Sequence, residues 1–501
     1  MKQRMNKRMV GDGIALITGG LLPLAFAPYQ GALLAILSPA LLFWLWLNCS
    51  PKRALWRGWL YGIGLFSIGV SWIHASIYQF GGVPLVGAIA LTILFVTFMG
   101  LYFALLGWFV TRFFPKTNTV KLLLVLPASW TLIEWFRGWF LSGFPWLSLG
   151  YSQIDSPLSG FAPVLGVYGV TWLTAFLASV LVYSWAMPAK KVTLAVAVLS
   201  IVIIVGLGKG LSQHTWTQAK DKPINVALIQ GNIPQEFKWT YPYIRESLER
   251  YLNLSQQHRD ANLIIWPETA IPHFYEEVPD FIALVEQEHT DYHTDFLIGM
   301  PVGNYQQYYN GLVNISEKNS FYFKQHLVPF GEYIPLQDQL GELLKILHIP
   351  MASFTPGQAH QANLIAADEP LGISICYEDA FGELVRQSLP EATLLVNVSN
   401  DGWFGDSIAP HQHLEIARMR ALETGRYLLR ATNTGISAII DPKGKITQQA
   451  AQFKLTGLSA IVYPAEGNTP YILFGNSFVI ILLCVVLTFG IIYTVIADRK
   501  T

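Results

Sequence analysis

A cysteine follows a β-type run in the longest polar stretch of this chain. Cys376 comes after Ile-Ser-Ile and precedes Tyr377, Glu378 and Asp379. A cysteine in a strand is most often a small hydrophobic core residue, but the charged and hydroxyl side chains directly after this one favour a nucleophile. A thiol with its usual pKa of about 8.5 is largely protonated at neutral pH, so this nucleophile needs a base or a cation beside it.

Two other motifs supply such partners. Glu268 follows a Trp-Pro pair at the predicted end of a strand, where proline stops the hydrogen-bond ladder and the carboxylate lies at the sheet edge. Lys324 is predicted inside an otherwise apolar strand, and Glu332 lies just beyond a Pro-Phe-Gly turn. Alone, Glu268 is typical of a solvated turn, and Lys324 of a charged residue that protects an edge strand. With Cys376 they predict a base, a cation and a nucleophile.

The segment that carries these residues has the pattern of an α/β domain. Short β-branched runs alternate with helical patterns from about residue 224 onward. Strands are predicted at 225–229, 263–266, 296–300, 309–315, 321–328 and 394–398, with a further strand that leads to Cys376. Helices are predicted at 243–258, 280–288, 381–388 and 411–424. One α/β domain over residues 212–469 is the simplest interpretation.

The rest of the chain is predicted to lie in a lipid bilayer. Hydrophobic residues make up 52% of the sequence and charged residues only 13%, which is unusual for a soluble chain of this length. A bilayer core about 30 Å thick needs roughly 20 apolar residues per helix. Eight such runs are predicted, at 11–27, 31–48, 58–78, 84–110, 121–137, 162–186, 193–210 and 471–495. The domains are therefore seven transmembrane helices in 1–211, the α/β domain in 212–469, and an eighth helix with a short tail in 470–501.

The positions of the cations predict the orientation in the membrane. Every second loop is basic, and these loops contain residues 2–8, 52–57, 112–121, 190–191 and 499–500. Because cytoplasmic loops carry an excess of Lys and Arg, both termini are predicted to be cytoplasmic. The α/β domain is then periplasmic, at the inner membrane of a Gram-negative bacterium.

An aromatic-rich segment over residues 134–146 lies in one of the outer loops. Trp and Tyr at such positions are typical of the aromatic belt at a membrane interface. The alternative is that Arg137 holds a lipid phosphate, with Glu134 as a local partner for its charge. Both interpretations stay open.

The sequence predicts no metal, no cofactor and no nucleic-acid partner. His411 and His413 stand two residues apart, so on a helix they point to different faces, and no Cys or carboxylate spacing supports a zinc site. No glycine-rich nucleotide-binding motif follows a strand. Lys and Arg together number 33, the same as Asp and Glu together, so there is no basic excess for nucleic acid. Nothing demands a partner chain, and a monomer is expected.

The pattern resembles the nitrilase, or carbon–nitrogen hydrolase, superfamily. The resemblance rests on a Glu after Trp-Pro, a Lys ahead of His-Leu-Val-Pro-Phe-Gly-Glu, and a Cys in Ile-Cys-Tyr-Glu. Segments 230–234, 400–406 and 430–435 are similar to further signatures of the family. Within the superfamily, the whole chain is similar to the membrane-bound N-acyltransferases that modify apolipoproteins. That likeness implies an eight-helix membrane bundle joined to a nitrilase-like α-β-β-α sandwich.

The resemblance implies ping-pong acyl transfer. A phospholipid, expected to be phosphatidylethanolamine, gives an acyl chain to Cys376, and the thioester acylates the α-amine of a diacylglyceryl apolipoprotein. Glu268 would take the thiol proton, and Lys324 with the Tyr377 backbone N–H would stabilise the oxyanion. Supporting catalytic or substrate-binding roles are implied for Glu332, Tyr377, Glu378 and Trp239.

An apolar stretch inside the polar domain, residues 343–351, contains Leu344 and Ile346. It is either an ordinary core helix or a mobile arm that dips into the outer leaflet and admits acyl chains, and the arm is favoured. Two other functions stay open for the chain as a whole. A membrane-tethered amidase would use the same triad with water as acceptor, and a non-catalytic lipoprotein-binding protein would keep only the fold.

Overall fold

The computed structural model describes residues 2–187, 190–335 and 354–499, and the chain divides into two compact units. The first unit comprises Met1–His74, Val86–His214 and Phe474–Thr501, and the second comprises Ala75–Leu85 and Thr215–Leu473. Leu344 and Ile346, which the sequence assigns to a membrane-dipping arm, lie outside the described residues.

Two six-stranded sheets form the centre of the second unit. The first sheet has the order β13 (Thr456–Val462), β2 (Ile224–Gln230), β3 (Leu263–Ile265), β4 (Asp295–Asn304), β5 (Gln307–Ile315) and β6 (Ser320–Phe323). The second has the order β12 (Ile446–Gln449), β11 (Ala438–Ile440), β10 (Leu428–Thr432), β9 (Leu394–Ser399), β8 (Glu369–Ile375) and β7 (Leu364–Ala366). Strands β2 to β4 run parallel to one another, as do β8 to β10, and the outer pairs are antiparallel. The central strands of each sheet therefore end at a common edge.

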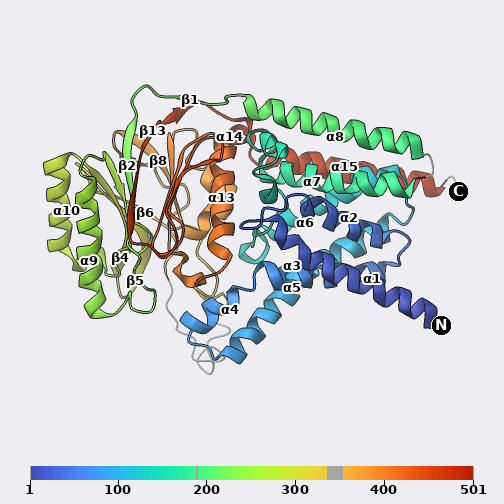
Figure 1. Ribbon diagram of the computed structural model, residues 1–501, viewed down its shortest axis with the longest axis horizontal. Helices are drawn as coiled ribbons and strands as arrows, with labels where there is room; N and C mark the ends of the chain where they lie inside the picture. The colour runs from blue at the N-terminus through green and yellow to red at the C-terminus, as the bar shows by residue number, and fades with distance from the viewer. Residues whose placement is uncertain (1, 188–189, 336–353, 500–501) are drawn as a thin grey trace. The chain divides into compact units, whose positions relative to one another are not determined.

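The two sheets pack face to face and are covered by helices. Side chains alternate along β2, so Val226 and Leu228 enter the core between the sheets, while Ala227 and Ile229 face outward. The outer face of the first sheet packs against α9 (Tyr241–Ser255) and α10 (Pro279–Tyr292), and that of the second against α12 (Gly382–Arg386) and α13 (Ala409–Thr424). The result is the predicted α-β-β-α sandwich, with α9 and α10 on one side of the strands and α13 on the other (Figure 1).

One predicted strand is too long. The pattern predicts a strand over 321–328 with Lys324 inside it, but β6 ends at Phe323. The N–H groups of Gln325 and His326 donate to Glu378 Oε1 at 2.6 and 3.1 Å, so they are not available to a neighbouring strand. A buried carboxylate, which an apolar pattern does not reveal, ends the strand and leaves Lys324 at its end.

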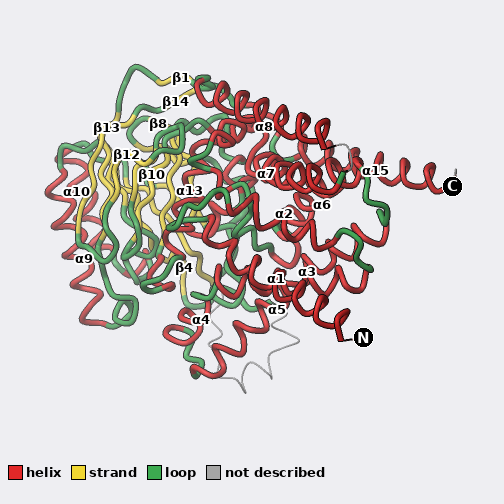
Figure 2. The backbone as a smooth tube through the Cα atoms, turned by 45° about the vertical axis from the view of Figure 1, so that its right-hand side comes forward, coloured by secondary structure: helices red, strands yellow, loops and turns green. Residues whose placement is uncertain are grey.

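The first unit is helical, as the colouring of Figure 2 shows. Its helices are α1 (Lys2–Leu21), α2 (Leu34–Trp46), α3 (Pro51–Gly69), α5 (Leu85–Phe113), α6 (Leu126–Arg137), α7 (Ala162–Ala186), α8 (Lys190–Gln213) and α15 (Ser477–Arg499). Small residues let α1 and α3 pack closely, since a Cβ added at Gly19 would lie 2.0 Å from Tyr61 O and one at Gly64 would lie 2.2 Å from Leu16 O.

The expectation of eight spans is confirmed only in part. Within the described residues, five helices are long and apolar enough to cross a membrane: Arg8–Ala25, Leu85–Phe113, Pro157–Ala186, Lys191–Gln213 and Ser477–Ile496. A sixth span arises if Pro51–Gly69 and Ile73–Phe80, which meet at a 60° bend, count as one.

The remaining two predicted spans are also helical: the one at 31–48 gives a short helix, and the one at 121–137 is helical without a break. The apolar run at 31–48 gives α2, whose 13 residues rise only about 20 Å against a bilayer core of about 30 Å. The run at 121–137 is a π-helical turn, Lys121–Val125, followed by the 12 residues of α6. A hydropathy window counts apolar residues and does not locate the ends of a helix. Those ends depend on turns, such as the one that precedes Pro51 at the start of α3.

Candidate active site

The second unit brings Glu268, Lys324 and Cys376 together at the ends of three strands. They follow β3, β6 and β8, and their exposed fractions are 6%, 1% and 8%. Lys324 Nζ lies 3.2 Å from Glu268 Oε1 and 2.9 Å from Glu332 Oε1. Both Glu268 and Lys324 act electrostatically on the Cys376 thiol. A carboxylate, an ammonium and a thiol therefore share one buried site.

The nucleophile occupies a strained position. Cys376 has a φ of 53°, in the left-handed region that non-glycine residues seldom adopt. It is the first residue of a short turn, Cys376–Ala380, directly after β8. Such a conformation persists only where the surroundings fix it, and it is frequent at functional sites.

Glu378 ties this turn to the segment after β6. Its Oε2 accepts hydrogen bonds from Ile375 N at 2.7 Å and from the Tyr322 hydroxyl at 3.1 Å, and its Oε1 accepts those of Gln325 N and His326 N. Burial raises the pKa of Glu378 to about 7, although the main-chain donors act in the opposite direction. One carboxyl thus fixes the spacing between the thiol and the ammonium.

Glu268 is held as a carboxylate. Its Oε1 accepts from Asn310 Nδ2 at 2.8 Å as well as from Lys324, and its Oε2 accepts from Asn400 N at 2.9 Å. Burial would raise its pKa, but the Lys324 ammonium and the Asn310 amide outweigh burial, so the pKa of Glu268 lies below its usual value. At neutral pH this side chain can accept a proton, which is what a general base must do.

Lys324 is held as a cation. Burial disfavours its charged form, but the carboxylates of Glu268 and Glu332 outweigh burial and raise the pKa of Lys324 above its usual value. Lys324 therefore does not act as a base at neutral pH. It can donate hydrogen bonds to developing negative charge.

Cys376 is a thiol in the resting site. Burial raises its pKa, Glu268 and Asp401 raise it further, and Lys324 and a hydrogen bond with Ser399 lower it only in part. The thiolate therefore does not accumulate before substrate arrives. Proton transfer to a base must accompany attack, and Glu268 is the carboxylate positioned for it.

Lys238 is a second buried cation beside Glu268. Its side chain is 1% exposed, and its Nζ donates to the main-chain oxygen of Glu268 at 3.3 Å. Burial lowers the pKa of Lys238 to about 7, and Glu268 acts against that shift. The neighbouring Trp239 is 53% exposed, whereas Lys238 contacts the main chain of Glu268.

Sequence reasoning missed several polar groups of the site. Asn400 directly follows β9 and begins the signature segment 400–406, but no role in the site was predicted for it from the sequence. Asn310 gave no signal, because it lies within the antiparallel strand β5, yet its Nδ2 bridges Glu268 and Glu332 at 2.8 Å to each. Tyr377 packs edge-on against Phe381, with ring centroids 5.0 Å apart. The implied roles of Tyr377 and Trp239 stay predictions.

Arg137 belongs to the first unit and is 1% exposed. Its guanidinium donates to Phe144 O and Trp146 O, each at 2.6 Å, and lies 5.5 Å from the Phe66 ring centroid. Glu134 accepts hydrogen bonds from the Trp130 indole and from the Leu149 main chain. These contacts hold the aromatic loop together, and phosphate binding by Arg137 stays a prediction.

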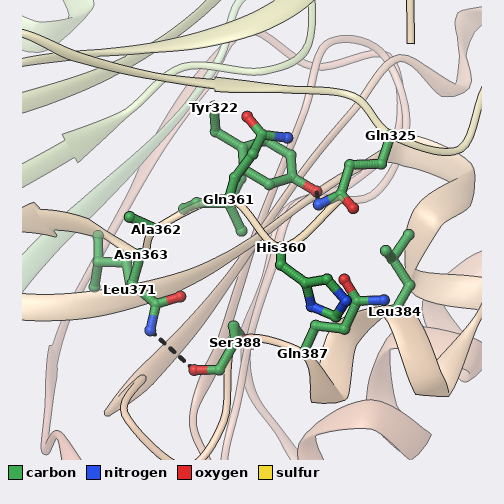
Figure 3. A pocket seen from close by; sticks show the side chains of 11 residues that line it. Tyr322, Gln325, His360, Gln361, Ala362, Asn363, Leu371, Leu384, Gln387 and Ser388 are labelled. Carbon is green, nitrogen blue, oxygen red and sulfur yellow. Dashed lines mark hydrogen bonds between the residues drawn. The ribbon is translucent and has the colours of Figure 1, made fainter. Parts of the chain in front are cut away.

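A small cavity lies between Tyr322, Gln325 and Ser388 (Figure 3), and the Tyr322 hydroxyl donates a hydrogen bond to Glu378. It offers about 20 Å³ to the centre of a water molecule, room for about one water. Part of its rim is fixed by the Asn363 amide, which donates to Ser388 O at 2.9 Å. A space of about 20 Å³ is smaller than an acyl chain.

Gly299 on β4 is expected to be essential for the position of Glu268. A Cβ at this position would lie 2.2 Å from Pro267 O and 2.7 Å from the Cα of Glu268, both in the backbone of the turn. Gly299→Ala should destabilise the fold by about 1–3 kcal/mol and displace the carboxylate. Thermal unfolding together with activity checks this, with Gly206→Ala as the control because nothing lies within 4 Å of that position. Wild-type activity in Gly299→Ala would contradict it.

Two stacked sheets between helices, with Glu, Lys and Cys at strand ends, define the carbon–nitrogen hydrolase class. The family model described as carbon-nitrogen hydrolase matches residues 225–466. A second model, described as the apolipoprotein N-acyltransferase N-terminal domain, matches residues 18–180.

Two relatives that are similar to the chain over most of its length carry the same name. The apolipoprotein N-acyltransferase of Methylococcus capsulatus is 48% identical over 469 residues, 92% of each chain. That of Vibrio cholerae is 40% identical over 494 residues, 95% of this chain and 96% of the relative. The chain belongs to the apolipoprotein N-acyltransferase family. Among solved structures, Saccharomyces cerevisiae Nit3 is similar at 18% identity over 49% of this chain and 93% of that one, with a TM-score of 0.38.

Proposed function

We propose that the chain is a membrane-bound N-acyltransferase that moves an acyl chain from a phospholipid to the α-amine of an apolipoprotein through a thioester on Cys376. The observation that carries the proposal is the buried site in which Lys324 contacts Glu268 and both act on the Cys376 thiol. Membership of the apolipoprotein N-acyltransferase family supports the donor and acceptor classes.

The first half-reaction acylates the enzyme. The Cys376 sulfur attacks the ester carbonyl carbon of the phospholipid while Glu268 takes the thiol proton. The oxyanion accepts hydrogen bonds from the Lys324 ammonium and the Tyr377 backbone N–H. The carbon–oxygen bond then breaks, Glu268 returns the proton to the leaving lysophospholipid oxygen, and a thioester remains on Cys376.

The second half-reaction consumes the thioester. The acceptor's α-ammonium first releases one proton to solvent, and the neutral amine attacks the thioester carbonyl. Glu268 takes a second proton from the nitrogen as the carbon–nitrogen bond forms, and it passes that proton to the departing Cys376 sulfur. The products are an amide on the lipoprotein and the free thiol, so the triad is restored.

The remaining predicted residues have supporting roles in this proposal. Glu332 orients Lys324, which it contacts at 2.9 Å, and Glu378 holds the turn that presents the thiol. Tyr377 supplies a backbone donor, and Trp239 and Arg137 are assigned to substrate binding by resemblance alone. No metal and no cofactor take part.

We also propose the cellular arrangement. Helices in 1–211 and 470–501 lie in the bacterial inner membrane with both termini cytoplasmic, and the catalytic domain, 212–469, is periplasmic. The alternation of basic loops supports this topology, and the long apolar helices are compatible with a membrane location. Phosphatidylethanolamine is the proposed donor and a diacylglyceryl apolipoprotein the acceptor, and the enzyme acts as a monomer.

Purified protein, incubated with phosphatidylethanolamine and a diacylated lipopeptide, tests the function. Mass spectrometry should detect a triacylated lipopeptide and, without acceptor, a protein whose mass rises by one acyl group. The acyl group should map to Cys376 and be absent from Cys376→Ser, whereas Cys484→Ser, at an exposed cysteine, should behave as wild type. Free fatty acid as the sole product would favour a hydrolase instead. If wild type shows no acylated species, the ping-pong mechanism is wrong.

A further inference from the structure

Behind the turn of Cys376 lies a group of buried charges that the proposed reaction does not use. We name Asp379, Asp401, His413 and Arg430 the elbow clamp. Their exposed fractions are 0%, 2%, 1% and 0%. They come from the turn after β8, the turn after β9, helix α13 and strand β10. Four buried ionisable side chains in one place need a reason, because unpaired charge is costly to bury.

The clamp is a closed ring of ion pairs. His413 Nε2 lies 2.9 Å from Asp379 Oδ1, and its Nδ1 lies 2.9 Å from Asp401 Oδ1. Arg430 contacts the other oxygens of the same two carboxylates, at 3.3 Å for Asp379 and 2.9 Å for Asp401. Two cations therefore bridge two anions, and the charges cancel when His413 carries both ring protons.

The clamp contacts the nucleophile through its main chain. His413 Nε2 lies 3.3 Å from the Cys376 carbonyl oxygen, and Asn397 Nδ2 lies 3.3 Å from the same oxygen. Asn397 in turn accepts a hydrogen bond from Arg430 through its Oδ1. His413, which belongs to the clamp, and Asn397, which the clamp holds, thus fix the carbonyl of Cys376, whose φ is 53°.

That carbonyl belongs to the same peptide group as the Tyr377 N–H. A trans peptide is planar, so its N–H points opposite to its C=O. When the clamp holds the Cys376 oxygen on one side, the Tyr377 N–H is directed to the other. The orientation of this N–H matters because the proposed oxyanion can only accept hydrogen bonds. Its stabilisation therefore depends on donors that are already held in place.

We propose that the elbow clamp is a positioning device that aims the Tyr377 N–H at the oxyanion of the acylation step, with His413 as a doubly protonated link between the two aspartates. The inference rests on the proposed function for the identity of that step. His413 and Arg430 are positioning residues, since they touch the main chain of Cys376 and not the substrate.

The protonation state of His413 follows from its partners. Both ring nitrogens face carboxylate oxygens, so both need a hydrogen. Burial and Arg430 disfavour the imidazolium, but Asp379 and Asp401 outweigh them and raise the pKa of His413 to about 9. A raised folded pKa contributes stability that is complete below the unfolded value of about 6.5 and is lost as pH rises through about 9. The clamp should therefore loosen in alkaline solution.

Two reactions of Cys376 distinguish an effect on the position of the Tyr377 N–H from an effect on the reactivity of the thiol. Acylation by p-nitrophenyl butyrate passes through an oxyanion, whereas alkylation by iodoacetamide does not, and neither needs a lipid substrate. His413→Asn keeps a donor near the Nδ1 position and loses the one toward the Cys376 carbonyl, while His413→Gln keeps a donor near Nε2. Acylation should fall at least about tenfold in His413→Asn, with alkylation within about threefold of wild type. His413→Gln should recover much of the loss.

The control is His411→Asn, two residues away on α13, which should match wild type in both reactions. A parallel fall of acylation and alkylation in His413→Asn, or no fall in acylation, would overturn the proposal. If His413→Asn does not fold, the pH dependence of the wild-type protein tests the proposal instead. Its ratio of acylation to alkylation rates should stay level up to about pH 9 and fall above it, and a level ratio at higher pH would refute the clamp. The phospholipid assay could fail while the acylation and alkylation rates of the variants still behave as expected. That result would count against the proposed substrate and not against the clamp.

Discussion

Glu268→Gln should lower the rate of acyl-enzyme formation by about 10²- to 10⁴-fold, the usual contribution of a general base. The Cys376 thiol is protonated at rest, since burial and the neighbouring carboxylates raise its pKa. The reaction therefore needs a proton acceptor at the moment of attack, and an amide cannot serve as one. Single-turnover acylation by phosphatidylethanolamine, followed by intact mass, measures the effect.

The change at Glu268 conserves shape and removes only charge and basicity. Glu249→Gln is a suitable control, because Glu249 is exposed on α9 and pairs only with Arg245 at 2.9 Å in the described contacts. It should acylate as wild type does. The rate of Glu268→Gln should rise with pH, since hydroxide replaces the missing base. Acylation near the wild-type rate in Glu268→Gln at neutral pH would show that another group takes the thiol proton.

The sheet edge was readable from the sequence because strand ends carry local signals. A proline after Trp266 and a polar run after Ile375 each mark the end of a buried strand, and the carboxyl ends of parallel strands share one edge. The alternation of strands and helices predicted an α/β domain, and the resemblance to the family implied its α-β-β-α layers. The end of β6 was not readable, because the group that ends it, Glu378, lies more than fifty residues away in the chain.

The contacts that set the pKa values and positions of the site residues could also not be predicted from a local sequence pattern. His413 stands two residues from His411 in the sequence and no local pattern gives it a role, because its partners Asp379 and Asp401 lie 34 and 12 residues away. Hydropathy, in turn, located the apolar runs but not the helix ends, because an apolar run such as 31–48 does not state where its helix begins and ends. Residue types at strand ends predict the reactive groups, whereas their electrostatics depend on long-range packing.

Lys324→Met should lower acylation by about 10²- to 10³-fold and also destabilise the fold by about 3–5 kcal/mol. The ammonium is the largest influence that lowers the pKa of Glu268 against burial, and it pairs with Glu332 at 2.9 Å. Without it, two buried carboxylates lose their counter-charge. The pKa of Glu268 should then rise, so the acidic limb of the acylation profile should move to higher pH.

Stability and catalysis can be separated at this position with a second change. In Lys324→Met combined with Glu332→Gln, one carboxylate is neutralised, so much of the lost stability should return, as measured by chemical denaturation in detergent. Acylation should stay low, because the oxyanion still lacks its ammonium donor. Glu332→Gln alone should lose less activity than Lys324→Met, since Glu268 still holds the ammonium at 3.2 Å. If the double variant regains both stability and acylation, Lys324 acts only by balancing buried charge, and the oxyanion must depend on the Tyr377 N–H and on other donors.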